Sequence, residues 1–186
     1  MSRHRKRVLS VLAAVCGIAL LGERAHAAGS VKRIGVQAGF AGVAGNEGTF
    51  AGYGGALSFG YGLTDSFTLA ANVTGTSNQV AKEGGRSLVL SQALGIEYAL
   101  DVIQVVPYVG VYGSIYEIQG GGIKDRQIKW GGELAIGINW VYSRDFTFGV
   151  DFRGHVLPED FIKAPDSPSP FYVTSFLKAE YTWGWF

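Results

Sequence analysis

Period-two alternation between large apolar residues and small or polar ones constrains this chain more than any other feature. It recurs in segments of about ten residues from Ile34 to the end of the chain, and turn-forming residues separate the segments. Between Ile128 and Trp140, for example, Ile, Leu and Trp alternate with Lys, Gly, Glu, Ala and Asn. This period places the two sets on opposite faces of a β-strand. The sequence therefore predicts an all-β protein.

Eight segments of this kind predict an antiparallel, up-and-down β-barrel of eight strands. They lie near residues 34–41, 51–63, 67–74, 88–98, 105–115, 128–140, 146–155 and 173–185. Short connections near 65, 101 and 144 alternate with longer ones at 44–50, 75–86, 117–127 and 157–170. This alternation and an even strand number are typical of outer-membrane barrels. The fifth segment is apolar on both faces, and the prediction turns one set outward: Val105, Pro107, Val109, Val111 and Ile115.

The barrel is predicted to be transmembrane because of what occupies its second face. A water-facing surface should carry charges at about a quarter to a third of its positions. Here the second face is mostly Gly, Ala, Ser, Thr and Asn, and small side chains suit the interior of a narrow eight-stranded barrel. The large apolar set is almost free of charge, as a lipid-facing surface must be. A soluble barrel with the apolar set turned inward is the alternative.

Aromatic residues gather where a membrane barrel has its two girdles. The four tryptophans are predicted at or near strand ends: Trp130, Trp140, Trp183 and Trp185. Other aromatic residues flank the short turns: Tyr61, Phe67, Tyr98, Tyr142 and Phe146. Amphipathic rings at both edges of an apolar band mark the membrane–water interfaces.

Residues 1–27 are predicted to be a cleaved signal peptide, which leaves residues 28–186 as the barrel domain. Basic residues from Arg3 to Arg7 precede an apolar run, and Ala25 and Ala27 supply the small residues of a cleavage site. The run, from Val8 to Leu21, is shorter than the about 20 residues that a spanning helix needs. A signal anchor that stays in the inner membrane is the alternative. Export of a barrel with an apolar outer face predicts that the mature protein lies in the bacterial outer membrane.

The charge and cysteine content of the mature chain exclude several classes of function. Removal of residues 1–27 takes five basic residues and one acidic residue from totals of 16 and 15, which leaves a net charge of about −3. Without a basic patch, nucleic acid is not an expected partner. Cys16 leaves with the signal, and one histidine without cysteine cannot form a closed transition-metal site. Neither a metal nor a cofactor is therefore expected.

Charged residues on the predicted inner face are the candidate functional site. They lie on three successive strands: Glu133, Asp151, Arg153, Lys178 and Glu180. Buried charges are tolerated only when they pair and hydrogen-bond. Arg153 is the expected hub, within reach of Glu133 or Glu180 depending on register. The network either fills and seals the barrel or acts as a gate whose members exchange partners.

The strand pattern, the turn Tyr61-Gly62-Leu63-Thr64-Asp65 and the aromatic C-terminus resemble small outer-membrane barrels of the OmpA/OmpX type. The resemblance covers nearly all of residues 31–186. It implies that the barrel-assembly machinery reads the last strand, where Tyr181, Trp183 and Trp185 alternate out of register with Phe186. Either Trp185 is the effective signal residue, or the strand slips by one. The other partners that the resemblance implies are outer-membrane lipid and lipopolysaccharide. The barrel is expected to be a monomer.

His155 is the only histidine of the mature chain and the one candidate for catalysis. The resemblance implies that barrel enzymes acting on lipid A use a histidine with a nearby serine and acid, and that the deacylases among them carry the serine two residues after the histidine. Here that position is Leu157, so His155 is expected to be a polar residue near the external mouth. The last predicted loop contains three acidic residues: Glu159, Asp160 and Asp166. They are either simply exposed to solvent, or they bind calcium that bridges to lipopolysaccharide.

The sequence thus favours a non-enzymatic outer-membrane barrel with a largely plugged lumen and a structural, surface-contact or low-conductance role. A small-solute channel gated by the lumenal charges is the first alternative. A lipid A-modifying enzyme is the second.

Overall fold

The computed structural model describes residues 31–45, 48–79, 85–100, 104–120, 123–157 and 171–184. They form eight strands: β1 Lys32–Gly45, β2 Gly48–Gly62, β3 Phe67–Gln79, β4 Arg86–Ala99, β5 Val105–Gly120, β6 Ile123–Val141, β7 Phe146–Val156 and β8 Phe171–Trp183. Within these residues no helix has the length and apolar character to cross a membrane.

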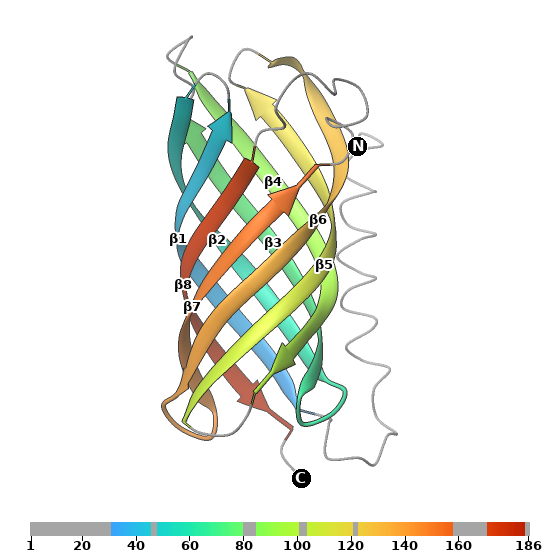
Figure 1. Cartoon of the computed structure of the whole chain (residues 1–186), viewed down its shortest axis with the longest axis vertical. Helices are drawn as coiled ribbons and strands as arrows, with labels where there is room; N and C mark the ends of the chain where they lie inside the picture. The colour runs from blue at the N-terminus through green and yellow to red at the C-terminus, as the bar shows by residue number, and fades with distance from the viewer. Residues whose placement is uncertain are drawn as a thin grey trace, which may run out of the picture.

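Each strand pairs antiparallel with the next along the chain, and β1 pairs with β8 to close the barrel. The closing ladder aligns Ile34 with Tyr181 and Val36 with Ala179. Figure 1 shows the strongly tilted strands that closure at this strand number requires. The prediction of an eight-stranded up-and-down antiparallel barrel is confirmed.

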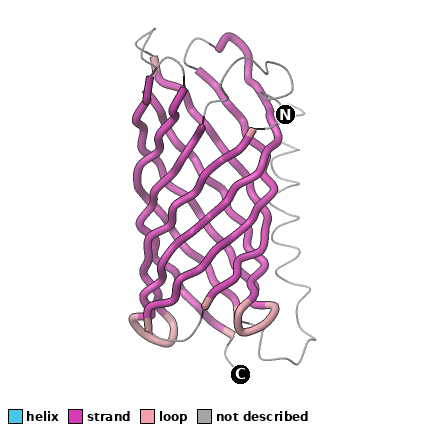
Figure 2. Tube along the Cα trace, in the orientation of Figure 1, coloured by secondary structure: helices cyan, strands magenta, loops and turns pink. Residues whose placement is uncertain are grey.

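The turns at 63–66 and 142–145 lie at one end of the barrel, called the short-turn end below (Figures 1 and 2). Each is held by a hydroxyl that accepts a backbone hydrogen bond: Phe67 N–H donates to Thr64 Oγ1 (3.0 Å) and Phe146 N–H to Ser143 Oγ (3.1 Å). Ser and Thr stabilise tight turns in this way. The third predicted short turn, near 101, falls largely outside the described residues.

The strands at the opposite end are longer than predicted. The prediction of long loops at 75–86 and 117–127 is wrong for much of each range. Strand β3 continues to Gln79, β5 continues to Gly120 and β6 begins at Ile123. Thr76 and Asn78 look like loop residues in the sequence, yet they alternate inward and are buried in the lumen. Pairing with neighbouring strands satisfies the backbone there, so a polar sequence is no obstacle.

The predicted facing holds for the strand residues whose side chains the structure describes. Leu134 and Val111 are 60% and 64% exposed on the outside, whereas Ala135 and Tyr112 beside them are 1% and 3% exposed inside. The ambiguous strand β5 follows the same rule, with alternate residues exposed and buried from Val105 to Tyr116. Over the described strands the exterior is therefore a largely apolar surface, and the interior is the packed part of the molecule.

Aromatic side chains form a belt around the short-turn end. Ring pairs join neighbouring strands there: Phe67 with Tyr98 at 5.0 Å and Phe146 with Tyr181 at 5.3 Å between centroids. Trp183 ends β8 in the same belt. Trp130, by contrast, lies well inside β6 rather than near its end, because that strand begins at Ile123.

Candidate functional site: the ion-pair network of the lumen

Large tyrosines enter the lumen because glycines on the adjacent strand leave room for their rings. Tyr108 pairs in register with Gly137, and Tyr112 pairs with Gly95. A Cβ added to Gly137 would lie 2.5 Å from the Tyr108 ring, and one on Gly95 would lie 2.6 Å from the Tyr112 ring. Each ring therefore lies directly over bare backbone and reaches toward the barrel axis.

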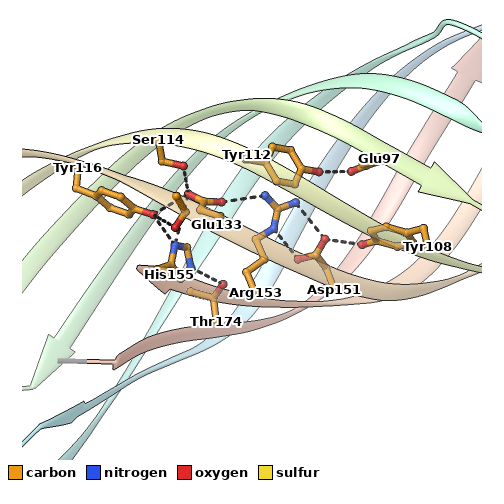
Figure 3. A network of polar contacts seen from close by, with 11 residues as sticks. Glu97, Tyr108, Tyr112, Ser114, Tyr116, Glu133, Asp151, Arg153, His155 and Thr174 are labelled. Atoms are coloured by element: carbon orange, nitrogen blue, oxygen red, sulfur yellow. Dashed lines mark hydrogen bonds and ion pairs between the residues drawn. The ribbon is translucent and has the colours of Figure 1, made fainter. Parts of the chain in front are cut away.

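Arg153 on β7 is the centre of the first ionic cluster. Its Nε donates to Asp151 Oδ1 (2.7 Å), its Nη2 to Asp151 Oδ2 (3.1 Å) and its Nη1 to Glu133 Oε2 (3.2 Å). All three side chains are almost fully buried. The guanidinium group thus binds Asp151 in a bidentate manner and Glu133 through a single hydrogen bond, and bidentate charge-assisted pairs of this kind are strong. Figure 3 shows Arg153 between the two acids.

His155 extends this cluster away from the short-turn end. Its Nδ1 lies 3.0 Å from the Tyr116 hydroxyl and 3.4 Å from Glu133 Oε1, and its Nε2 lies 3.2 Å from Thr174 Oγ1. The ring also packs on Tyr172, with centroids 4.4 Å apart. The name Arg153 cluster is used below for six residues: Tyr116, Glu133, Asp151, Arg153, His155 and Thr174 (Figure 3).

A second cluster lies nearer the short-turn end and is called the Arg33 cluster: Arg33, Glu97, Lys178 and Glu180. Arg33 Nη2 donates to Glu97 Oε2 (2.9 Å), and its Nη1 lies 3.7 Å from Glu180 Oε2. Lys178 Nζ is 3.5 Å from the same Glu180 oxygen. The Arg33–Glu97 pair joins β1 to β4 across the lumen, since these strands are not neighbours.

Two tyrosines of β5 connect the clusters reciprocally. Tyr108 donates to Asp151 of the Arg153 cluster (2.5 Å), while Lys178 Nζ of the Arg33 cluster lies 4.1 Å from its ring centroid. Tyr112 donates to Glu97 of the Arg33 cluster, while Arg153 lies 4.8 Å above its ring. Each ring thus binds an acid of one cluster and a cation of the other. The two clusters form one cross-linked network.

The structure brings together all five charges expected in the lumen, but in two groups. Arg153 contacts Glu133 and not Glu180, which pairs with Arg33 and Lys178. Sequence reasoning missed Arg33 because it precedes the first predicted strand. It also missed the role of Glu97, although alternation places Glu97 on the inner face.

Two further expectations have separate outcomes. His155 is not a mouth residue, as its side chain is 1% exposed and enclosed by β5, β6 and β8. The described part of β8 keeps a continuous register with β1 up to Trp183, with Tyr181 facing outward.

Several predicted residues lie outside the described residues: Ala25, Ala27, Glu159, Asp160, Asp166, Trp185 and Phe186. Residues 1–27, predicted to be a signal peptide, also lie there. Within the described ranges, no group of three or more His, Cys, Asp or Glu residues is arranged to hold a metal ion.

Solved structures with this architecture come from several bacteria. Neisserial surface protein A is 16% identical with a TM-score of 0.61, and the match covers 81% of this chain and 95% of that one. Ail, the attachment invasion locus protein of Yersinia pestis, is 13% identical with a TM-score of 0.58 over 83% and 99%. The outer membrane protein OprG from Pseudomonas aeruginosa is 12% identical with a TM-score of 0.57 over 83% and 97%. At these identities the likeness shows the fold.

A search of curated protein sequences gives no match. Residues 10–167, however, match the family described as outer membrane protein beta-barrel domain. That range is most of the chain and includes β1 to β7. With its closed eight-stranded barrel and apolar exterior, this chain belongs to the outer membrane protein β-barrel family.

Proposed function

We propose that this protein is a non-enzymatic outer-membrane barrel whose lumen is sealed and whose role lies in membrane structure or surface contact. The observation that carries the proposal is the cross-linked network of the lumen. Its side chains come from β1, β4, β5, β6, β7 and β8 and meet near the axis. A solute crossing the barrel would have to separate these groups.

The energetics support a closed ground state. Removing one partner from a buried ion pair costs about 3–5 kcal/mol. If the opened form lies higher in free energy by that amount, its population is about 1% or less, because each 1.4 kcal/mol is a factor of ten in the equilibrium. Arg153 would lose bonds to two acids at once, and the tyrosine links oppose separation of one cluster without the other.

A surface-contact role is consistent with the names of two structural relatives. One is named a surface protein and the other an attachment invasion locus protein. In this chain the strands extend furthest at the end opposite the short turns, where β5 and β6 reach Gly120 and Ile123. We propose that this end faces outward from the cell and that the short turns face the periplasm.

A gated channel is the second candidate, favoured by the position of Lys178. Its ammonium group lies over Tyr108, whose hydroxyl binds Asp151, so a second cation lies close to the acid that Arg153 holds. An exchange of Arg153 for Lys178 at Asp151 would preserve a charge pair while the guanidinium moved.

Conductance in planar lipid bilayers separates the sealed barrel from the channel. The sealed barrel predicts no steady ion current from the wild type and none at low voltage from Arg126→Ala, a control arginine on the outer surface. A channel predicts current in the wild type that rises in Arg153→Ala. Current from the wild-type protein would overturn the sealed-lumen proposal. Absence of current from both the wild type and Arg153→Ala would rule out the channel.

The absence of enzymatic activity is proposed from the surroundings of His155. Its contacts are Tyr116, Glu133, Tyr172 and Thr174, all buried. A nucleophile hydrogen-bonded to a base must also be reachable by substrate, and this site is closed by its own packing. An unchanged lipid A profile in a His155→Gln strain supports the proposal, and a changed profile contradicts it.

Lipopolysaccharide is the proposed lipid partner, and the barrel-assembly machinery, acting on β8, is the proposed folding partner of a monomeric barrel. Two arginines point outward beyond the apolar band: Arg86 lies 4.7 Å over the exposed Tyr53 ring, and Arg126 pairs with Glu117 at 2.5 Å. Guanidinium groups at this level suit phosphate groups of the outer leaflet. Substitution of both by Gln is expected to weaken co-purification of lipopolysaccharide.

A further inference from the structure

One amide side chain lies on the apolar outer face of β4. Gln92 is partly exposed and faces outward between Leu90 and Leu94 of the same strand. Its partners in register are Val73 on β3 and Ile115 on β5, and both are exposed on the outer surface. None of the residues that the structure describes forms a hydrogen bond with the Gln92 amide. A polar group therefore lies among apolar ones on the surface that faces lipid.

Gln92 lies near the middle of the apolar band. It is six residues from Tyr98, whose ring belongs to the aromatic belt at the short-turn end. Six residues of a tilted strand rise by about 15 Å along the barrel axis, and the apolar band of a membrane barrel is about 25 Å tall. The amide is therefore too deep for lipid headgroups or bulk water to reach it.

An amide at this depth has hydrogen-bonding groups that lipid does not satisfy. The side chain carries two N–H donors and a carbonyl acceptor, whereas acyl chains offer neither donors nor acceptors. A polar group without a hydrogen bond is unfavourable in hydrocarbon. A second glutamine amide satisfies both kinds of group at once, because each Nε2–H donates to the other's Oε1.

The surface beside Gln92 allows another barrel to approach closely. Gly75 on β3 and Gly113 on β5 are its diagonal neighbours, and Gly132 on β6 pairs with Gly113. The backbone is therefore bare on both sides of the amide. Small residues at contacts between membrane segments let the backbones come close to each other. Gln92 and these three glycines are called the Gln92 face below.

The packing of the barrel itself does not require these glycines. A Cβ added to Gly113 would meet nothing within 4 Å, and one on Gly132 or Gly75 would meet its nearest atom at 3.5 or 3.9 Å. Inward-facing glycines differ, since a Cβ on Gly95 or Gly131 would lie 2.1 or 2.3 Å from a backbone oxygen. Contact with another molecule gives the bare outer positions a reason that the barrel's own packing does not.

We propose that the Gln92 face is the interface of a dimer in which two barrels meet side by side in the membrane. Gln92 of each barrel hydrogen-bonds Gln92 of the other. A two-fold axis along the membrane normal brings identical residues together, so a second copy of this chain is the partner that matches a single amide. Each barrel is complete by itself. Pairing therefore adds an interface to a protein that folds as a monomer, and it leaves the lumen sealed.

Energy transfer between two populations of the mature chain, labelled at the N-terminus with different fluorophores and reconstituted in lipid vesicles, tests the dimer. We expect transfer that rises with the protein-to-lipid ratio. Gln92→Leu should weaken association by about tenfold, because two interchain hydrogen bonds in lipid are lost. The matched control is Ser175→Ala, which removes an outward-facing hydroxyl from β8, four strands away around the barrel. It should associate like the wild type.

Two results of this experiment would overturn the proposal. One is wild-type transfer no greater than random collision in the membrane gives. The other is equal association of Gln92→Leu and the wild type, since the dimer would then use another face. Folding does not confuse the comparison, because leucine at position 92 keeps the lipid-facing surface apolar.

Gly113→Leu tests the bare backbone separately. The new side chain has open space in the barrel, so boiled and unboiled samples should migrate as those of the wild type do. On the Gln92 face it would hold two barrels apart, and association should weaken by about tenfold or more. Unchanged association would place Gly113 outside the interface and overturn the proposal.

Thiol cross-linking in the membrane identifies the partner. The mature chain has no cysteine, because Cys16 lies within residues 1–27. Leu94→Cys, next to Gln92 on the outer face, should give a product of twice the chain's mass with a short bifunctional maleimide. Leu177→Cys, which is 70% exposed on β8, should not. Equal yields from both positions, or a Leu94→Cys product that contains a different protein, would overturn the proposal.

Discussion

The hydroxyl of Tyr108 donates a 2.5 Å hydrogen bond to Oδ2 of Asp151, and this bond joins the two charge clusters of the lumen. The same ring lies under the ammonium group of Lys178 at 4.1 Å. The Tyr108 side chain therefore links the position of Lys178 to that of Asp151. Asp151 in turn is bound to Arg153. The lumen is therefore packed as one unit.

Tyr108→Phe should destabilise the barrel by about 1.5–3 kcal/mol, because a hydrogen bond to a charged group is lost. The ring remains, so its packing on Gly137 and under Lys178 is preserved. Urea unfolding in lipid vesicles, followed by tryptophan fluorescence, measures the change. Tyr142→Phe is the control, since Tyr142 is 64% exposed on the outer surface, and it should change stability by less than about 0.5 kcal/mol. Equal effects of the two substitutions would contradict the lumenal role of Tyr108.

Arg153→Met should cost about 3–5 kcal/mol, because it leaves Asp151 and Glu133 buried without their main cation. Addition of Asp151→Asn and Glu133→Gln to the same chain should restore part of that loss. The control is Arg126→Met on the outer surface, whose pair with Glu117 is more exposed and is worth about 0–1 kcal/mol. The same unfolding assay compares them. A loss of less than about 1 kcal/mol in Arg153→Met would mean that the cluster is not buried as a unit.

Gly137→Ala should destabilise the barrel by about 1–3 kcal/mol, as overpacking does. Its new methyl group would lie 2.5 Å from the Tyr108 ring, whereas the control Gly113→Ala meets nothing within 4 Å. Gly113→Ala should leave stability within about 0.5 kcal/mol of the wild type. If both variants behave alike, the Tyr108 ring does not lie over Gly137.

Leu134→Arg should cost about 2–4 kcal/mol, because it puts a charge on the apolar outer face near the middle of β6. Leu63→Arg, in the turn at the short-turn end, should cost about 0–1 kcal/mol, since it lies at the edge of the apolar band. Both leucines are exposed, at 60% and 46%, so water accessibility alone does not distinguish them. Equal costs in vesicles would mean that Leu134 does not contact lipid.

Strand number, order and facing could be predicted from the sequence because alternation is a local property. Ile34 faces outward and Gly35 inward regardless of what lies across the barrel. The same alternation places Tyr108 and Tyr112 of β5 inside the barrel, although both faces of that strand are apolar. Strand ends were harder, since β3 continues through Thr76 and Asn78, where turn-forming residues and strand residues with short polar side chains look alike.

Contacts across the lumen could not be predicted in this way. Arg33 meets Glu97 from a strand three places along the barrel, and which residues face each other at that range depends on tilt and stagger. Alternation indicated that Arg153 faces inward, but the choice between Glu133 and Glu180 needed the register. The burial of His155 also depended on Tyr116 and Tyr172 enclosing it from two other strands.

The mobility of unboiled and boiled protein on a denaturing gel tests the central claim, a closed membrane barrel packed as one unit, most directly. A barrel closed by the β1–β8 ladder and packed with buried ion pairs should resist detergent at room temperature and should unfold on boiling. We predict two distinct mobilities for protein from the outer-membrane fraction, with Arg153→Met converting to the unfolded mobility at a lower temperature than the wild type. A single mobility with and without boiling, or recovery of the protein from the soluble periplasm, would contradict the account.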